Sequence, residues 1–433
     1  MNIPKRTGMK PRVLLDISLL GHAPSVWRGM ERVGWHLFEG LRTSGQCELS
    51  CVATSHLAGA EEFLAGRKDV PEIQLRCRPG QLRFSRLGLR ISKVVQRSIT
   101  NRHLSARVWR WSLARTAQAC CTGEARLTPE LLRDADIYHT PHMPFPAAVR
   151  QVSHLRKFIT VHDFNPLMFP EFFHAGDARF MDDLRGCLTP DHFAFCVSET
   201  VKQDILKFSK IPAERIFVTP LAADEAIFYP ETDPQILAAC RARYHIPENP
   251  YFLSVSAHAP HKNFAHLIHC FGRLVEAGDL PDMSLVIVGP NPQRNPEAQA
   301  ALAKYPRAQA RVILAGRVPD ADMAAICSGA RAFLFPSLFE GFGMPPLEAM
   351  QCGTPVIASN TTSIPEVVGG AGILLPPKDT DRWCQAMLSL ANDTKLQDDL
   401  KVKSLTRAKA FSWPQFVEKT LRGYRIGMEQ PLS

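Results

Sequence analysis

The sequence predicts an α/β protein built from two doubly wound domains that face each other across a cleft. Three observations support this prediction. The chain has 433 residues, which is too long for one ordinary core and enough for two domains of about 200 residues each. Short apolar runs alternate with helical patterns along both halves, as in parallel sheets covered by helices. Residues 220–250 are rich in Pro, Ala and charge and contain no strong strand, so we expect the linker there.

The first half begins with a buried parallel strand at 13–18 (VLLDIS) and an amphipathic helix at 29–42 (GMERVGWHLFEGLR). Its later strands are predicted at residues 48–53, 136–139, 158–161 and 193–197. The second half repeats the alternation, with strands predicted at residues 251–256, 284–288, 312–315, 332–335, 355–358 and 372–375. Ligands of such sheets bind beyond the carboxyl ends of the strands, where helix N-termini point. We therefore expect the binding site in the cleft.

The composition, with 45% hydrophobic and 21% charged residues, is typical of a soluble globular protein. No apolar run approaches the roughly 18 to 20 residues of a membrane-spanning helix. The first residues, MNIPKRTGMKPR, lack the apolar core of a signal peptide, so we expect a cytoplasmic location. The twelve cysteines are scattered without a CxxC pair, so the sequence indicates neither a zinc site nor a disulfide framework.

The net charge of +9 is concentrated in one segment. Residues 73–123 contain no Asp or Glu, whereas basic residues recur from Arg76 to Arg115 among apolar ones. This mixture suits basic amphipathic helices on the anionic inner face of the cytoplasmic membrane. A solvated basic face packed on its own domain is an equal alternative. Nucleic acid is a third, but no recognition motif accompanies the charge, so we expect no nucleic-acid partner.

The stretch FPSLFEGFGMPPLEAM, residues 335–350, passes from a buried strand through a glycine-containing loop into a helix. Gly341 and Gly343 allow close backbone approach and unusual dihedral angles, and the following pair of prolines fits the first turn of a helix. Free N–H groups of that turn attract an anion. Glu340 and Glu348 then suit the hydroxyls of a sugar and a ribose, because carboxylates bind vicinal diols well. The alternative is a solvated turn residue and an ordinary helix charge.

Other polar side chains follow neighbouring strands. Lys262 stands at the start of a helix in PHKNFAHLIHCF, where a cation is unfavourable unless it meets an anion such as a diphosphate. His162 and Asp163 end a strand of the first half, in FITVHDFNPL, on the expected cleft side. The turn from Gly29 to Arg32 also follows a strand, at the mouth of the first helix. Each has a structural alternative: a solvated lysine, a core histidine or a simple helix start.

With these residues assembled, the chain resembles the family four glycosyltransferases, which have the GT-B fold of two facing Rossmann-like domains. The resemblance runs from LLDISLLG through VTPLAADEAIFYP to FSWPQFVEKTL, and is strongest from RVILAGRVPDADM to TSIPEVVGGAGILLPP. The two Glu of the family's EX7E motif match Glu340 and Glu348. The resemblance implies an N-terminal acceptor domain at 1–220, a nucleotide-sugar domain at 221–411 and a last helix, 412–433, that crosses back to the first domain.

The resemblance also implies roles for single residues. His162 and Glu340 are expected to be catalytic, with Glu340, Phe342, Gly343 and Met344 contacting the transferred sugar. The residues expected to bind the nucleotide are Gly29, Ser256, His261, Lys262, Gly316, Arg317, Val318 and Glu348. One departure stands out, because many members read GTxEPRKN where this chain reads SAHAPHKN. His261 replaces an arginine, so phosphate binding is weaker or pH-dependent unless Arg317 substitutes.

Members of this family are retaining enzymes that use a nucleotide-activated sugar and no metal or other cofactor. We expect transfer of a hexose, with GDP-mannose favoured over a UDP-hexose as donor. The expected acceptor is a lipid-linked glycan or oligosaccharide in bacterial surface polysaccharide synthesis. A non-catalytic GT-B scaffold that binds a nucleotide is the alternative. A GT-B phosphorylase is a second rival, but the sequence shows no convincing pyridoxal phosphate lysine motif.

Overall fold

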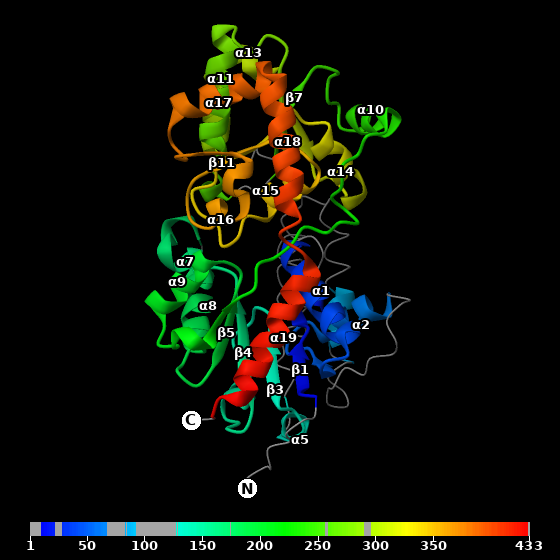
Figure 1. Ribbon diagram of the computed structural model, residues 1–433, viewed down its shortest axis with the longest axis vertical. Helices are drawn as coiled ribbons and strands as arrows, with labels where there is room; N and C mark the ends of the chain where they lie inside the picture. The colour runs from blue at the N-terminus through cyan, green and yellow to red at the C-terminus, as the bar shows by residue number, and fades with distance from the viewer. Residues whose placement is uncertain are drawn as a thin grey trace, which may run out of the picture.

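The computed structural model describes residues 10–21, 28–66, 83, 85–91, 127, 129–173, 175–255, 259–289 and 296–431. It contains two six-stranded sheets, with strand orders β2-β1-β3-β4-β5-β6 and β12-β11-β10-β7-β8-β9. Every pairing between neighbouring strands in these sheets is parallel. Figure 1 shows the two domains stacked along the long axis of the molecule. The predicted fold of two facing Rossmann-like domains is confirmed.

The first sheet carries the predicted strands and one more. Its strands are β1 Arg12–Asp16, β2 Glu48–Val52, β3 Ile137–Thr140, β4 Arg156–Val161, β5 Phe193–Cys196 and β6 Ile216–Val218. Its helices are α1 Arg28–Ser44, α2 Leu57–Ala65, α5 Pro129–Arg133, α6 Ala147–Arg150, α7 Asn165–Met168, α8 Ala175–Arg185 and α9 Glu199–Phe208. The strands β3 and β5 are buried along their whole length, as expected of a sheet covered on both faces.

The second sheet follows the prediction closely. Its strands are β7 Tyr251–Val255, β8 Ser284–Val288, β9 Val312–Gly316, β10 Ala332–Phe335, β11 Val356–Ser359 and β12 Ile373–Leu375. The accompanying helices are α11 Phe264–Ala277, α12 Pro296–Ala303, α13 Pro306–Gln309, α14 Asp320–Ser328, α15 Met344–Gln351, α16 Ile364–Val368, α17 Thr380–Asn392 and α18 Thr394–Ala408. The helix α10 Pro234–Arg243 lies within the predicted linker.

The last helix, α19 Trp413–Glu429, lies across the first sheet (Figure 1). Two of its glycines allow this close packing, because a Cβ on Gly423 or Gly427 would lie 2.5 Å from an aromatic carbon of the sheet. Between them, the Tyr424 hydroxyl lies 2.6 Å from Nδ1 of the buried His139 in β3. The end of the chain thus packs on the domain in which the chain began.

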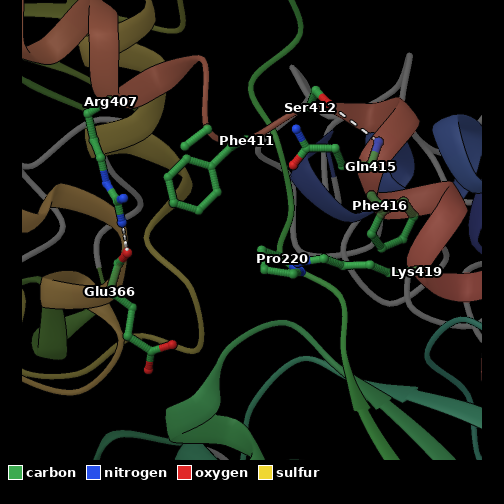
Figure 2. A pocket seen from close by; sticks show the side chains of 9 residues that line it. Pro220, Glu366, Arg407, Phe411, Ser412, Gln415, Phe416 and Lys419 are labelled. Atoms are coloured by element: carbon green, nitrogen blue, oxygen red, sulfur yellow. Dashed lines mark hydrogen bonds between the residues drawn. The ribbon is translucent and has the colours of Figure 1, made fainter.

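The chain therefore crosses between the domains twice, and both crossings line one cavity of about 260 Å³ (Figure 2). Pro220 belongs to the first crossing, and Phe411 and Ser412 belong to the second. Arg407 lies on the opposite wall and donates to the backbone carbonyl of Glu366. This cavity therefore lies where the chain passes between the two domains. Among the helices that the structure describes, none combines the length and hydropathy needed to cross a membrane.

Candidate active site

The loop between β10 and α15 has the conformation that its glycines and prolines predict. Gly343 precedes the helix with a φ of 107°, a value that favours glycine. Pro345 and Pro346 occupy the second and third helical positions. Because prolines carry no N–H, the free amides of this turn are those of Gly343 and Met344, and Leu347 N already donates to Gly343 O. Fewer N–H groups are therefore available to bind an anion at this helix end than the sequence suggested.

Gly341 brings this loop against the first domain. A Cβ on Gly341 would lie 1.9 Å from the carbonyl oxygen of His162, at the end of β4, so no other residue fits there without a shift of backbone. The Ser198 hydroxyl, at the N-terminus of α9, donates to the Gly341 carbonyl at 2.7 Å. Two candidate catalytic residues, His162 and Glu340, are thereby placed on facing sides of the boundary between the domains.

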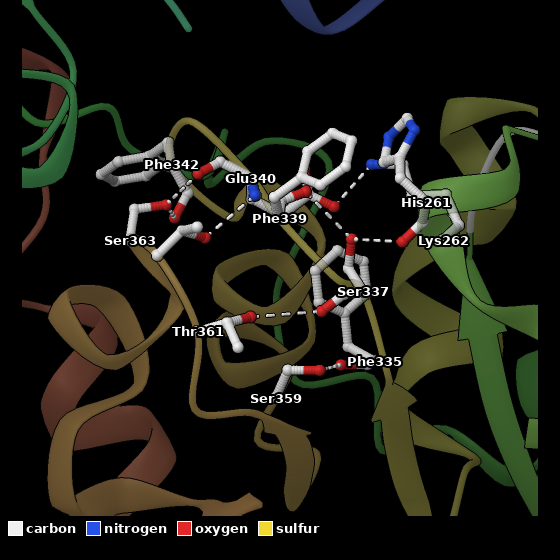
Figure 3. Close-up of polar contacts among 11 residues, drawn as sticks. His261, Lys262, Phe335, Ser337, Phe339, Glu340, Phe342, Ser359, Thr361 and Ser363 are labelled. Atoms are coloured by element: carbon white, nitrogen blue, oxygen red, sulfur yellow. Dashed lines mark hydrogen bonds and ion pairs between the residues drawn. The ribbon is translucent and has the colours of Figure 1, made fainter. Parts of the chain in front are cut away.

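Lys262 and Glu340 form an ion pair close to this domain boundary, with 2.6 Å between Nζ and Oε1 (Figure 3). Their side chains are 16% and 12% exposed, so the pair is largely removed from water. Lys262 Nζ also lies 5.6 Å from the centre of the Phe335 ring. The sequence placed both residues at the ends of neighbouring strands, and the structure brings their charged atoms into contact. A bound diphosphate would compete with Glu340 for Lys262.

Residues after β11 fix the Glu340 loop. The Glu340 N–H donates to the Thr362 hydroxyl at 3.0 Å. The Ser363 hydroxyl lies 2.9 Å from the carbonyl oxygens of both Glu340 and Phe342 (Figure 3). The Phe342 ring itself is buried and packs edge-on against Phe411. Phe342 can therefore contact a bound sugar nucleotide through its backbone but not through its ring.

His261 lies in an aromatic stack. Its ring is 4.6 Å from that of Phe339 and 5.8 Å from that of Phe173, which comes from the first domain. Burial, with a smaller contribution from Lys262, lowers the pKa of His261 to about 4. The ring is therefore neutral near pH 7. Its Nδ1 is buried and makes no hydrogen bond to any other described residue. Where the family has an arginine, this structure has an uncharged ring.

His162 is also neutral near pH 7. Burial lowers its pKa to about 4, and Nε2 lies 2.9 Å from the Pro141 carbonyl. Because a carbonyl oxygen only accepts, Nε2 carries the proton and Nδ1 is the acceptor. The neighbouring Asp163 accepts from the Asn165 N–H at 3.0 Å. Burial raises the pKa of Asp163 to about 6. Because its pKa is low and Nδ1 carries no proton, His162 is suited to accepting a hydrogen bond from a hydroxyl, and less suited to taking the proton of that hydroxyl.

Glu348 makes an ion pair across the domain boundary. Its Oε1 lies 3.0 Å from Nη1 of Arg32 in α1, and Nη2 of Arg32 lies 2.8 Å from Asp320 in α14. Burial raises the pKa of Glu348 to about 7, and Arg32 opposes this shift.

The sequence singled out the turn from Gly29 to Arg32 but assigned a role only to Gly29. Gly29 is exposed, in the first turn of α1. The contact of Arg32 was missed because its partner lies 316 residues away.

The remaining predicted residues lie at the ends of strands in the second domain. Gly316 ends β9 with a φ of 68°, and its carbonyl accepts from Gly289 at the end of β8. Arg317 and Val318 follow it, and Val318 is buried. Met344 is half-buried at the start of α15. Ser256 lies outside the described residues. The nucleotide and sugar roles of these residues stay predictions.

Within the part of the chain that the structure describes, no group of three or more His, Cys, Asp or Glu side chains is arranged to hold a metal ion. Lys262 supplies a positive charge at the Glu340 loop.

Comparison with known proteins extends this picture. Residues 249–393 match the model of a family described as glycosyl transferases group 1. O-antigen chain mannosyltransferase B of Escherichia coli is 29% identical over 291 residues, 67% of this chain and 74% of that protein. The serotype-specific mannosyltransferase WbdA of Escherichia coli is 27% identical over 61% of this chain, but the match covers only 32% of WbdA. O-antigen chain mannosyltransferase RfbU of Salmonella typhimurium is 29% identical over 54% of this chain and 60% of RfbU.

Solved structures match nearly the whole chain at low identity. A sucrose-phosphate synthase from Thermosynechococcus elongatus has a TM-score of 0.63 at 20% identity and covers 96% of this chain and 98% of its own. WaaG, a glycosyltransferase involved in lipopolysaccharide biosynthesis, has a TM-score of 0.61 at 14% identity, with 94% and 98% covered. These likenesses show the fold. Taken with the related mannosyltransferases, they identify this chain as a glycosyltransferase with the GT-B fold, in which residues 249–393 match the family described as glycosyl transferases group 1.

Proposed function

We propose that this protein transfers mannose from GDP-mannose, with retention of configuration, to a growing lipid-linked glycan of a bacterial surface polysaccharide. The relatives named above support mannose as the sugar and O-antigen-type glycans as the product class. The observation that carries the proposal is the buried pair of Lys262 and Glu340 on a loop that touches the backbone of His162. A cation for a diphosphate and a carboxylate for a sugar thus lie side by side at the cleft.

The ion pair suggests how donor binding begins. The diphosphate carries more negative charge than a single carboxylate, so it attracts Lys262 more strongly than Glu340 does. Lys262 then stabilises the charge that develops on the leaving diphosphate, together with the amides of Gly343 and Met344. Glu340, released from Lys262, accepts hydrogen bonds from hydroxyls of the transferred sugar. In this scheme Glu340 orients the sugar and does not attack it.

The transfer itself breaks the bond between the sugar C1 and the diphosphate oxygen and forms a bond from C1 to the acceptor oxygen. The acceptor attacks the face that the diphosphate leaves, and its proton passes to a departing phosphate oxygen. Neither step needs a protein base, which agrees with a neutral His162 of low pKa. His162 Nδ1 instead accepts from a sugar hydroxyl. We propose that the reaction requires no metal, so EDTA should leave the rate unchanged; a rate lost to EDTA and restored by Mg²⁺ would contradict this.

The experiment that tests the proposal is a thermal-shift screen of nucleotide sugars followed by product analysis. GDP-mannose is expected to raise the Tm more than UDP-glucose, and NMR of the product should show the anomeric configuration of the donor. An inverted product, or a stronger response to UDP-glucose, would contradict the corresponding part of the proposal. If nucleotides bind but no donor and acceptor pair gives product, the protein is the non-catalytic scaffold.

We also propose peripheral contact with anionic lipid through residues 76–115. Of these, the structure describes only 83 and 85–91. There, Arg86 pairs with Glu61 of α2 at 2.7 Å, and the Ser85 hydroxyl accepts from the N–H of Ala58 in the same helix. This short helical part is therefore packed on the first domain. Sedimentation with anionic and with neutral vesicles tests the contact, and equal partitioning would count against it.

A further inference from the structure

We propose that Arg32, a residue of the first domain, positions the Glu348 carboxylate of the second domain for the ribose of the donor. Arg32 would thus be a positioning residue that acts through Glu348, and the ribose subsite would be built from both domains. The inference rests on the proposed function, since it needs a nucleoside diphosphate at Glu348.

The guanidinium of Arg32 is held by three partners on three different elements. Nη1 lies 3.0 Å from Glu348 Oε1 in α15, and Nη2 lies 2.8 Å from Asp320 Oδ1 in the first turn of α14. Its central carbon lies 5.3 Å from the centre of the Phe228 ring, in the segment that joins the domains. A planar guanidinium that is held at both terminal nitrogens and packed on one face has little freedom to rotate. The carboxylate that it holds is fixed with it.

Burial sets the electrostatic need for this arginine. The Arg32 and Glu348 side chains are 16% and 12% exposed. Burial, together with smaller contributions from the carboxylates of Asp320 and Asp224, raises the pKa of Glu348 to about 7 even though Arg32 lowers it. Asp224 is itself kept ionised, because its contact with His36 lowers its pKa. The thiol of Cys327, also near Glu348, has a pKa well above its usual range and carries no charge at neutral pH. Arg32 is the one group named here that favours the ionised form of Glu348.

The ionisation of Glu348 decides what it can bind. A carboxylate has two acceptor oxygens and can take one hydrogen bond from each hydroxyl of a ribose diol. A protonated carboxyl has a hydroxyl in place of one acceptor and grips a diol less well. Without Arg32, the burial of Glu348 and its two acidic neighbours would leave it mostly protonated at neutral pH. Arg32 therefore preserves the form of Glu348 that suits the ribose.

Arg32 could have the opposite role and block the ribose site, and the two roles predict opposite changes in nucleotide affinity when Arg32 is removed. If Arg32 only occupied the ribose site and had to be expelled, its removal would tighten nucleotide binding. If it positions Glu348, its removal weakens binding, and the loss depends on pH because the carboxylate ionises as the pH rises. The measurement is the affinity of the full chain for GDP, and for UDP in parallel, by calorimetry at pH 6.5, 7.5 and 9.

The test compares Arg32→Gln with Arg243→Ala. Arg243 is a matched control, because it pairs with Asp322 on the same helix α14 at 2.6 Å but is 60% exposed. If Arg32→Gln raises the pKa of Glu348 by about one unit, the affinity for GDP should fall by roughly threefold at pH 7.5 and by roughly eightfold at pH 6.5. The deficit should shrink at pH 9, and Arg243→Ala should bind like the wild type at every pH. Arg32→Lys keeps the charge without the fork and should show a smaller loss, which provides a reading if Arg32→Gln folds poorly.

A double variant tests whether Arg32 acts through Glu348. Glu348→Gln should weaken GDP binding, and adding Arg32→Gln should cause little further loss, because the two residues form one unit. Unchanged or tighter binding by Arg32→Gln, a deficit that is equal at pH 6.5 and 9, or fully additive losses would overturn the inference. Failure of the wild type to bind either nucleotide would instead overturn the proposed function, and the inference with it.

Discussion

The backbone of Gly341, in the second domain, lies against the carbonyl oxygen of His162 in the first, with no room for a side chain between them. This contact joins the loop that carries Glu340 to the strand end that carries His162. The contact also explains why residue 341 is a glycine. Its φ is not positive, so the backbone conformation alone does not require glycine there. The close approach sets the distance across the cleft at the proposed reaction site.

Replacing Gly341 with alanine should therefore impair catalysis more than folding. A Cβ would lie 1.9 Å from the His162 oxygen, so the cleft must open slightly to admit it. Because displacements of about 1 Å at a reaction centre can cost about a hundredfold in rate, we expect a loss of kcat of that order. Gly176→Ala is the control, because a Cβ there meets nothing within 4 Å. Steady-state kinetics test this, and a variant with the wild-type kcat would contradict it.

Replacing Lys262 with alanine should destabilise the protein as well as weaken donor binding. The change leaves the largely buried carboxylate of Glu340 without its partner at 2.6 Å. Breaking such a pair costs about 3 kcal/mol in the free energy of unfolding, and the double variant Lys262→Ala with Glu340→Ala should recover part of it. Urea unfolding measures both. Equal stability of the single variant and the wild type would show that the pair is not effectively buried.

Glu366 should act as a clamp between the domains. Its carboxylate accepts from the N–H groups of Glu199 and Thr200 at 2.7 and 2.8 Å, so a side chain of the second domain caps α9 of the first. Ser198, the N-cap of α9, donates to the Gly341 carbonyl. Glu366→Gln should therefore loosen the contact between the domains and lower kcat/KM by about tenfold, as loss of a charge-assisted hydrogen bond implies. Glu297→Gln, an exposed change in the first turn of α12, is the control. An unaffected kcat/KM would argue that closure does not depend on Glu366.

Asp163 should make the stability of the protein depend on pH. Burial raises its pKa from 3.8 to about 6, so the folded state binds this proton more tightly than the unfolded state does. Stability from this group is therefore full below about pH 4 and is lost as the pH rises towards 6. Asp163→Asn removes the ionisation and should raise the Tm by more at pH 8 than at pH 5. A difference from the wild type that is the same at both pH values would rule this out.

The sequence predicted the layered fold well, because buried parallel strands are short, continuous apolar runs. Strand β6, Ile216–Val218, was not predicted. Helix α10 was taken for linker, and its exposed Ile236 shows that its apolar residues do not form one buried face. The motif residues Lys262 and Glu340 could be placed at one edge of the sheet, since they follow strands of the same sheet.

Contacts made between the domains could not be predicted in this way. The pairing of Arg32 with Glu348 and the capping of α9 by Glu366 depend on how two separately folded sheets meet. The charge of His261 is a further example, because its stacking partners Phe173 and Phe339 come from different domains. The sequence left open whether His261 replaces the family's arginine as a cation. Its low pKa follows from a burial that only the assembled cleft provides.

The most direct test of the proposed chemistry is the turnover of GDP-mannose by Glu340→Ala, measured beside its affinity for GDP. If Glu340 orients the transferred sugar, the variant should bind GDP at least as tightly as the wild type, because Lys262 remains to hold the diphosphate and no longer pairs with Glu340. Its turnover should fall about a hundredfold or more, because the sugar is no longer held in place. Turnover at the wild-type rate, with GDP affinity unchanged, would contradict the assignment of this site.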